Sequence, residues 1–172
     1  RSNLKHRWIS PAVIYNEEIL TLEEKLGLHP LVCQILSNRG FTTVEEVEKF
    51  LNPSLDDLHD PYLLDGMEPA VERVAKALSD GERIVIYGDY DVDGITSISL
   101  MVRYLRQLGG DVGYYIPHRM VEGYGISEAG IDRVVELGAS LVITVDCGIS
   151  AVEAIEYARS KGLETIVTDH HE

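Results

Sequence analysis

The sequence has few cysteines and no long apolar run, and each shortage excludes a class of protein. The two cysteines, Cys33 and Cys147, lie too far apart for a Cys-x-x-Cys motif and are too few for a disulfide scaffold. We therefore expect a reducing compartment and no cysteine-based zinc site. No stretch approaches the ~20 consecutive apolar residues of a membrane-spanning helix, and no basic start precedes an apolar segment. These shortages predict a cytoplasmic protein without membrane contact.

Basic residues are also scarce, with 15 Lys and Arg against 29 Asp and Glu and a net charge of −14. This is the wrong sign for a chain that holds a polyanionic nucleic acid on its own surface. The residues up to Gly81 and those after it are both acidic, so neither part is a basic module. If the substrate is a nucleic acid, metal ions and protein outside these 172 residues must supply the attraction.

The amino-terminal part has a helical pattern. Between Asn16 and Phe50 the apolar residues recur at three- and four-residue spacing, and Thr43 followed by Glu46 indicates a capping box. Residues 52–66, NPSLDDLHDPYLLDG, predict an irregular connector, and a helix is expected from Glu68 to Ser79. We therefore expect a helical lead-in and connector over residues 1–66, followed by a second domain over 67–172.

The second domain alternates apolar runs with helical patterns. Strands are predicted at 83–87, 111–116, 141–145 and 164–168, and helices at 94–108, 127–137 and 150–161. Strands rich in Val and Ile, separated by helices of about a dozen residues, are typical of a parallel sheet that is covered on both faces. The predicted fold is therefore α/β, a parallel sheet with helices on both faces, preceded by the small helical lead-in. In such sheets ligands bind beyond the carboxyl ends of the strands.

Acidic and imidazole side chains follow three of the four predicted strands. GDYDVDG follows the first strand, Asp146 follows the third in VITVDCGIS, and Asp169-His170-His171 follows the fourth. Clustered carboxylates repel by about 4 kcal/mol at 4 Å and an effective dielectric near 20, so protonation or a cation must offset the repulsion. Oxygen ligands with an imidazole nitrogen suit Mn²⁺ or a similar ion, and an aspartate shared by two ions is a common means of activating water. The pattern favours metal-assisted phosphoester hydrolysis.

Other interpretations fit parts of this pattern. Asp89, Asp91, Asp93 and Gly94 match the first half of an EF-hand loop, but its twelfth ligand would be Leu100 and a strand precedes it where a helix is needed. DVDGIT resembles the DxDGT of haloacid-dehalogenase phosphatases with the threonine one residue late.

Single residues also have simpler interpretations. Asp146 alone could form a turn, with Ser150 capping the next helix, and the two histidines could lie on the surface. Cys147 beside His170 could be a nucleophile, although a buried thiol is the commoner role. The joint placement of these groups at one edge favours the metal site.

The motifs GDYDVDGITS, VDCGIS and DHH, in this order and each after a predicted strand, resemble the DHH phosphoesterase superfamily. Within it, the match is to the RecJ family of single-strand-specific exonucleases, and it extends to FLNPSLDDLHDPYLLDGMEPAVERV and YYIPHRMVEGYGIS. The resemblance implies a Mn²⁺- or Mg²⁺-dependent 5′ to 3′ exonuclease that acts on single-stranded DNA in repair and recombination. It also implies two ions in the intact enzyme, with a helicase and a single-strand-binding protein as partners.

The resemblance further implies a role for each motif residue. Asp91 and Asp93 match ligands of the first motif, and Asp146 matches the ligand that bridges two ions. His170 matches a ligand of the second ion, and His171 matches the histidine that faces the scissile phosphate. The remaining roles are a phosphate contact for Arg119, shaping of the adjacent loop by EGYG (residues 122–125), and orientation of the ligands by Asp169 and Asp89, with direct ligation by Asp89 left open.

The sequence departs from the superfamily in two respects. Tyr87 stands where some members have a histidine ligand, and the family supplies a further aspartate and a substrate-binding domain downstream of DHH. We therefore expect an amino-terminal fragment that is inactive alone. The alternatives are a DHH-family phosphodiesterase or pyrophosphatase acting on small nucleotides, or a non-catalytic DHH-like scaffold module.

Overall fold

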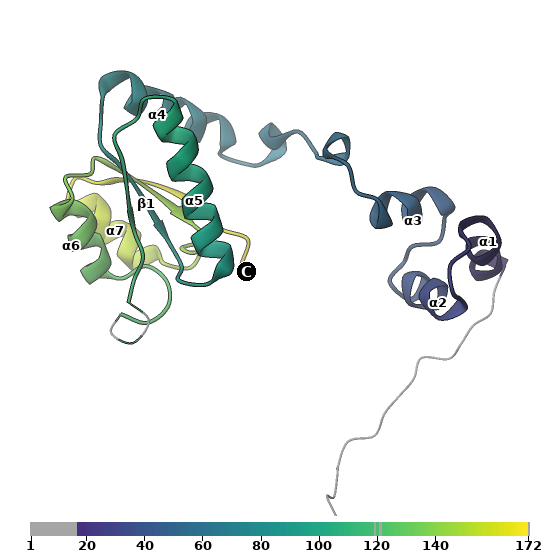
Figure 1. Cartoon of the computed structure of the whole chain (residues 1–172). Coiled ribbons are helices and arrows are strands. Elements are labelled where there is room, and N and C mark those ends of the chain that lie inside the picture. Colours follow the sequence, from purple (N-terminus) through teal and green to yellow (C-terminus); the bar gives the residue numbers. More distant parts are fainter. Residues whose placement is uncertain (1–16, 119, 121, 172) are drawn as a thin grey trace, which may run out of the picture. The chain divides into compact units, whose positions relative to one another are not determined.

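The computed structural model describes residues 17–118, 120 and 122–171 of the chain (Figure 1). These residues fall into two compact units, which divide between Asp60 and Pro61. The domain boundary between residues 66 and 67 stays a prediction. Among the described residues, no helix has both the length and the apolar character needed to cross a membrane.

The first unit is a small group of helices with its own core. Its elements are α1 (Glu17–Leu26), α2 (Pro30–Asn38), α3 (Val44–Leu51) and the single-turn 3-10 helix η1 (Leu55–Asp57). The predicted capping box is confirmed, because the Thr43 hydroxyl accepts the Glu46 N–H and the Glu46 carboxylate accepts the Thr43 N–H. The helices bury one apolar cluster, made of Ile19, Leu22, Cys33, Leu36 and Val47.

The second unit is the predicted α/β domain. Its elements are η2 (Pro61–Leu63), α4 (Met67–Asp80), β1 (Ile84–Gly88), α5 (Val92–Gln107), β2 (Val112–Tyr115), α6 (Glu128–Glu136), β3 (Leu141–Val145), α7 (Val152–Ser160) and β4 (Glu164–Thr168). The four strands are parallel and lie in the order β2-β1-β3-β4. The predicted fold class is therefore confirmed.

The central strands explain the apolar runs of the sequence. Every residue of β1 and β3 is buried, because alternate side chains pack on opposite faces of the sheet. Ile84 and Ile86 belong to one apolar cluster with α4 and α5, whereas Val85 and Tyr87 belong to another with α6 and α7. β2 and β4 form the edges of the sheet and are partly exposed. The predicted burial of the strands on both faces is therefore found in the central strands β1 and β3.

The strand register places the site. Gly88 pairs with Val145, and Val145 pairs with Thr168, so β1, β3 and β4 end side by side. The next residue after each of these strands is an aspartate. The sheet therefore places three carboxylates side by side at the carboxyl ends of its strands, as the sequence predicted.

Candidate metal centre

Three carboxylates converge at the ends of β1 and β3. Asp89, Asp91 and Asp146 each offer one oxygen, and these oxygens all lie within 4.8 Å of one another. Asp89 is only 3% exposed, and within the described part of the chain its Oδ1 is buried without a hydrogen-bond partner. A buried carboxylate oxygen without a partner is costly, and a cation among the three carboxylates would satisfy it.

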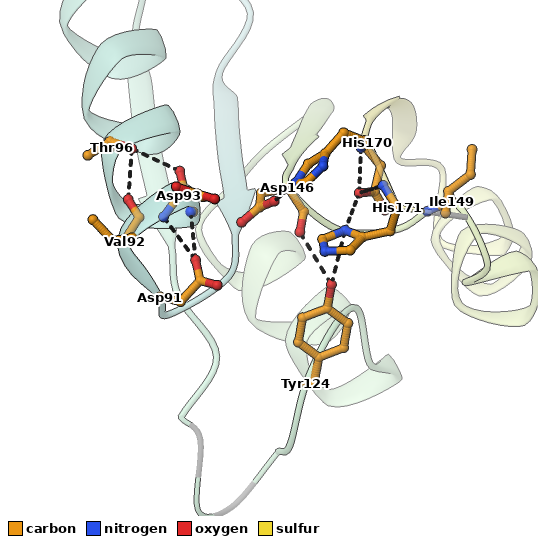
Figure 2. Close-up of polar contacts among 11 residues, drawn as sticks. Asp91, Val92, Asp93, Thr96, Tyr124, Asp146, Ile149, His170 and His171 are labelled. Carbon is orange, nitrogen blue, oxygen red and sulfur yellow. Dashed lines mark hydrogen bonds and ion pairs between the residues drawn. The ribbon is translucent and has the colours of Figure 1, made fainter. Parts of the chain in front are cut away.

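Asp91 is held by the start of α5. It is the N-cap of this helix, and its Oδ1 accepts the backbone N–H groups of Asp93 and Gly94, both at 3.0 Å (Figure 2). The hydrogen bond from Gly94 is the main cause that lowers the pKa of Asp91, with the Asp93 N–H as a further cause. The carboxylate is therefore ionised and fixed at the amino end of a helix, where negative charge is favoured.

Asp146 also takes part in a second group, with His170 and His171. His170 Nε2 lies 2.9 Å from Asp146 Oδ1. Asp146 has a φ of 61°, a left-handed conformation that Asp tolerates better than most residues, and its N–H donates to the Thr168 carbonyl at 3.0 Å. The turn after β3 thus directs one carboxylate toward both groups, as a ligand shared by two ions requires.

Asp169 contacts the backbone of His170 and the ring of His171. Its side chain is 2% exposed and accepts hydrogen bonds from the N–H of Ile149 at 3.0 Å, the N–H of His170 at 2.8 Å and the ring Nδ1 of His171 at 2.7 Å. Burial alone would raise its pKa, but the hydrogen bonds from Ile149 and His171 lower it to about 2. The hydrogen bond to Asp169 in turn raises the pKa of His171.

Two further residues that the sequence proposed for the site, Asp93 and Arg119, are not among the described residues that make up these groups. Among the described residues, Asp93 belongs to neither group; it lies in the first turn of α5 and is exposed, so its role as a ligand stays a prediction. Arg119, the predicted phosphate contact, lies outside the described residues. Tyr87 is fully buried and donates its hydroxyl to the Gly125 carbonyl at 3.1 Å, which makes it a loop anchor.

Two simpler interpretations of the turn after β3 do not hold. Ala151, without a side-chain cap, is the N-cap of α7, so Ser150 does not cap this helix. Cys147 is fully buried, and burial, followed by nearby carboxylates, raises its pKa to about 12. A thiol with so high a pKa is protonated at neutral pH and is a poor nucleophile.

Tyr124 is a site residue that the sequence did not predict. It lies within the EGYG segment, and its hydroxyl is 3.4 Å from His171 Nδ1 and 3.5 Å from the Asp146 carbonyl oxygen (Figure 2). Loops have no periodic pattern from which the direction of a side chain can be predicted, so in the sequence only the EGYG motif pointed to this segment.

The donor set fits a hard or intermediate divalent cation. One group offers three carboxylate oxygens, the other adds imidazole nitrogens, and Asp146 belongs to both. Such ligands suit Mn²⁺ or Mg²⁺ better than structural zinc, which prefers thiolates.

The comparison with protein families decides the assignment. The profile described as DHH family, N-terminal domain, matches residues 83–172, which contain all four strands and both groups of candidate ligands. The chain belongs to the DHH family. Its DHH domain is RecJ-like, because the similar proteins are RecJ exonucleases.

Two curated relatives show the extent of the match. The single-stranded-DNA-specific exonuclease RecJ of Bacillus subtilis is 45% identical over 156 residues, which cover 91% of this chain and 20% of that protein. RecJ of Escherichia coli K12 is 40% identical over 146 residues, which cover 84% of this chain and 24% of that protein. The chain with this DHH domain therefore spans between a fifth and a quarter of the length of these relatives.

Solved structures agree with this assignment. The crystal structure of an exonuclease RecJ bound to manganese is 42% identical to the chain, has a TM-score of 0.60, and covers 63% of this chain and 28% of the other. RecJ of Thermus thermophilus in complex with Mn²⁺ is 32% identical, has a TM-score of 0.67, and covers 90% of this chain and 21% of the other. RecJ from the same organism has also been solved with Mg²⁺.

Proposed function

We propose that the DHH domain binds Mn²⁺ or Mg²⁺ through Asp89, Asp91, Asp146 and His170. The observation that carries this proposal is the buried, unpartnered Oδ1 of Asp89 beside the two other carboxylates. Asp146 is proposed as the ligand shared by two ions, since it belongs to both groups. Asp93, at the start of α5, is retained as a further ligand on the basis of the family motif.

The whole protein is proposed to be a 5′ to 3′ exonuclease on single-stranded DNA that acts in repair and recombination in the cytoplasm. The relatives named above support this substrate. With a net charge of −14, the 172 residues repel DNA, so bound cations and the rest of the protein supply the attraction. A helicase and a single-strand-binding protein are proposed partners, because both present single strands.

The side chains divide the chemistry among them. Bound ions would supply a Lewis acid for the phosphodiester and an activated water. Asp91 and Asp146 hold the negative charge of the site in place through their backbone contacts. Asp169 holds the His171 ring at Nδ1, so that Nε2 faces the phosphodiester and gives a proton to the leaving oxygen.

Calorimetric titration with Mn²⁺ tests the metal site. The chain is expected to bind Mn²⁺ saturably, and Asp146→Ala is expected to abolish binding. Asp80→Ala is the matched control, because Asp80 is an exposed carboxylate at the end of α4 and pairs with Lys76, outside both groups. Equal binding by Asp146→Ala would refute the site.

Degradation of labelled single-stranded DNA by the whole protein tests the activity. Asp146→Ala and Asp93→Ala are expected to lower the rate at least a hundredfold, as removal of a metal ligand does, and Asp80→Ala is expected to leave it unchanged. Metal binding with hydrolysis of short oligonucleotides or small nucleotides alone would instead support the phosphodiesterase or pyrophosphatase alternative. No metal binding by the whole protein would support a scaffold module.

A further inference from the structure

The loop between β2 and α6 is tied down by one carboxylate. Glu122 Oε2 accepts the Tyr115 hydroxyl at 2.7 Å, and Glu122 Oε1 accepts the His118 N–H at 2.8 Å. The Glu122 N–H donates back to the His118 carbonyl at 2.9 Å. These bonds connect the loop to β2 and fix the residues that follow Glu122.

The same loop is anchored from β1 by Tyr87. This side chain is fully buried, and its hydroxyl donates to the Gly125 carbonyl at 3.1 Å. Gly130 in α6 makes room for it, since a Cβ at that position would lie 2.5 Å from the Tyr87 hydroxyl. Tyr124 stands between Glu122 and Gly125, so anchors on both sides fix its position.

Tyr124 reaches the candidate metal centre through its hydroxyl and its ring. The hydroxyl lies 3.4 Å from His171 Nδ1 and 3.5 Å from the Asp146 carbonyl oxygen, and the two rings meet edge to face at 82° with centroids 6.1 Å apart (Figure 2). The ring arrangement is a favourable aromatic geometry. The two polar contacts are at the long end of the hydrogen-bond range.

The protonation of His171 decides what the hydroxyl does. His171 Nδ1 lies 2.7 Å from the Asp169 carboxylate, which accepts hydrogen bonds only, so Nδ1 carries a proton directed at Asp169. Nδ1 then has no lone pair for the Tyr124 hydroxyl, whose own proton is directed at the Asp146 carbonyl. The hydroxyl therefore bonds to the backbone of Asp146 and lies beside the edge of the His171 ring without a hydrogen bond to it.

We propose that Tyr124 is a positioning residue for His171. Asp169 holds the Nδ1 atom of the His171 ring, and the His170 ring lies beside it with centroids 4.4 Å apart. The Tyr124 hydroxyl, bonded to the Asp146 carbonyl, places the Tyr124 ring edge to face with the His171 ring, and this contact sets the direction of Nε2. This inference rests on the proposed function, because it assigns His171 a place opposite the phosphodiester.

Tyr124→Phe in the whole protein tests the inference, because it removes the hydroxyl and keeps the ring. We expect kcat on single-stranded DNA to fall about tenfold, as expected for a misplaced catalytic group, with KM, Mn²⁺ affinity and Tm unchanged. Tyr104→Phe is the control, since Tyr104 is an exposed tyrosine of α5. In a crystal structure of Tyr124→Phe, the His171 ring is expected to have turned relative to Asp169.

The other outcomes overturn the inference. An unchanged kcat in Tyr124→Phe would do so directly. An unchanged Tyr124→Phe together with a raised KM in Tyr124→Leu would show that the ring stacks on a DNA base. If the unsubstituted protein does not hydrolyse single-stranded DNA, the proposed function fails, and the crystal structure then decides alone: an unmoved His171 ring in Tyr124→Phe refutes the positioning role.

Discussion

Asp89 is a buried carboxylate that lies beside two others. It is 3% exposed, lies beside Asp91 and Asp146, and has a buried oxygen without a partner among the described residues. Asp89→Asn keeps the shape and removes one charge, so we expect the metal-free protein to gain about 1 kcal/mol, as often happens when a functional charge is neutralised. Thermal unfolding should show a Tm that is about 3 °C higher without metal and a lost response to Mn²⁺.

Asp80→Asn is the control for this substitution, because Asp80 is an exposed carboxylate paired with Lys76. It should leave the Mn²⁺ response unchanged. If Mn²⁺ raised the Tm of Asp89→Asn as much as that of the unsubstituted chain, Asp89 would not be a ligand.

At the scale of elements, the start of α5 packs directly on the turn after β1. A Cβ on Gly94 would lie 2.3 Å from the Asp89 carbonyl oxygen, so Gly94→Ala must push the helix away from the turn. We expect a loss of about 2 kcal/mol in the free energy of unfolding and at least tenfold weaker Mn²⁺ binding, although Gly94 has no ligand atom in its side chain. Urea unfolding and calorimetry measure the two effects.

Gly113→Ala in β2 is the matched control, since the nearest atom to its Cβ would be an Arg83 guanidinium nitrogen at 3.4 Å. It should change stability by less than about 0.5 kcal/mol. Alanine is the better helix former, so stabilisation by Gly94→Ala would contradict the packing argument.

The elements also show how far the sequence could predict the site. Parallel strands end at one edge, so Asp146 and Asp169 could be placed together from the positions of the strands alone. The backbone torsions of the turn between β1 and α5 decide whether Asp89 or Asp93 lies in the same group as Asp91. The alternating positions of the three aspartates in the sequence do not determine these torsions. Tyr124 could not be placed, because its position depends on the hydrogen bonds of Glu122 and Tyr87 to distant parts of the domain.

For the whole molecule, charge sets the relation to DNA. The chain has a net charge of −14 and spans 20% of RecJ of Bacillus subtilis. A protein that contacts DNA phosphates through Lys and Arg binds more tightly as salt falls, because counterions are released. We expect the opposite for the 172-residue chain, since lower salt strengthens repulsion between like charges.

Fluorescence anisotropy with a labelled oligothymidine in EDTA measures how the affinity of the chain for single-stranded DNA depends on salt. The affinity of the chain should be weaker than about 100 μM at physiological salt and should not improve when the salt is lowered, and the chain should show little or no nuclease activity with Mn²⁺. The whole protein is the control and should bind more tightly at low salt. Salt-sensitive micromolar binding, or robust degradation of single strands by the 172-residue chain, would show that the DHH domain holds DNA by itself. The rest of the protein would then not be needed to attract the DNA.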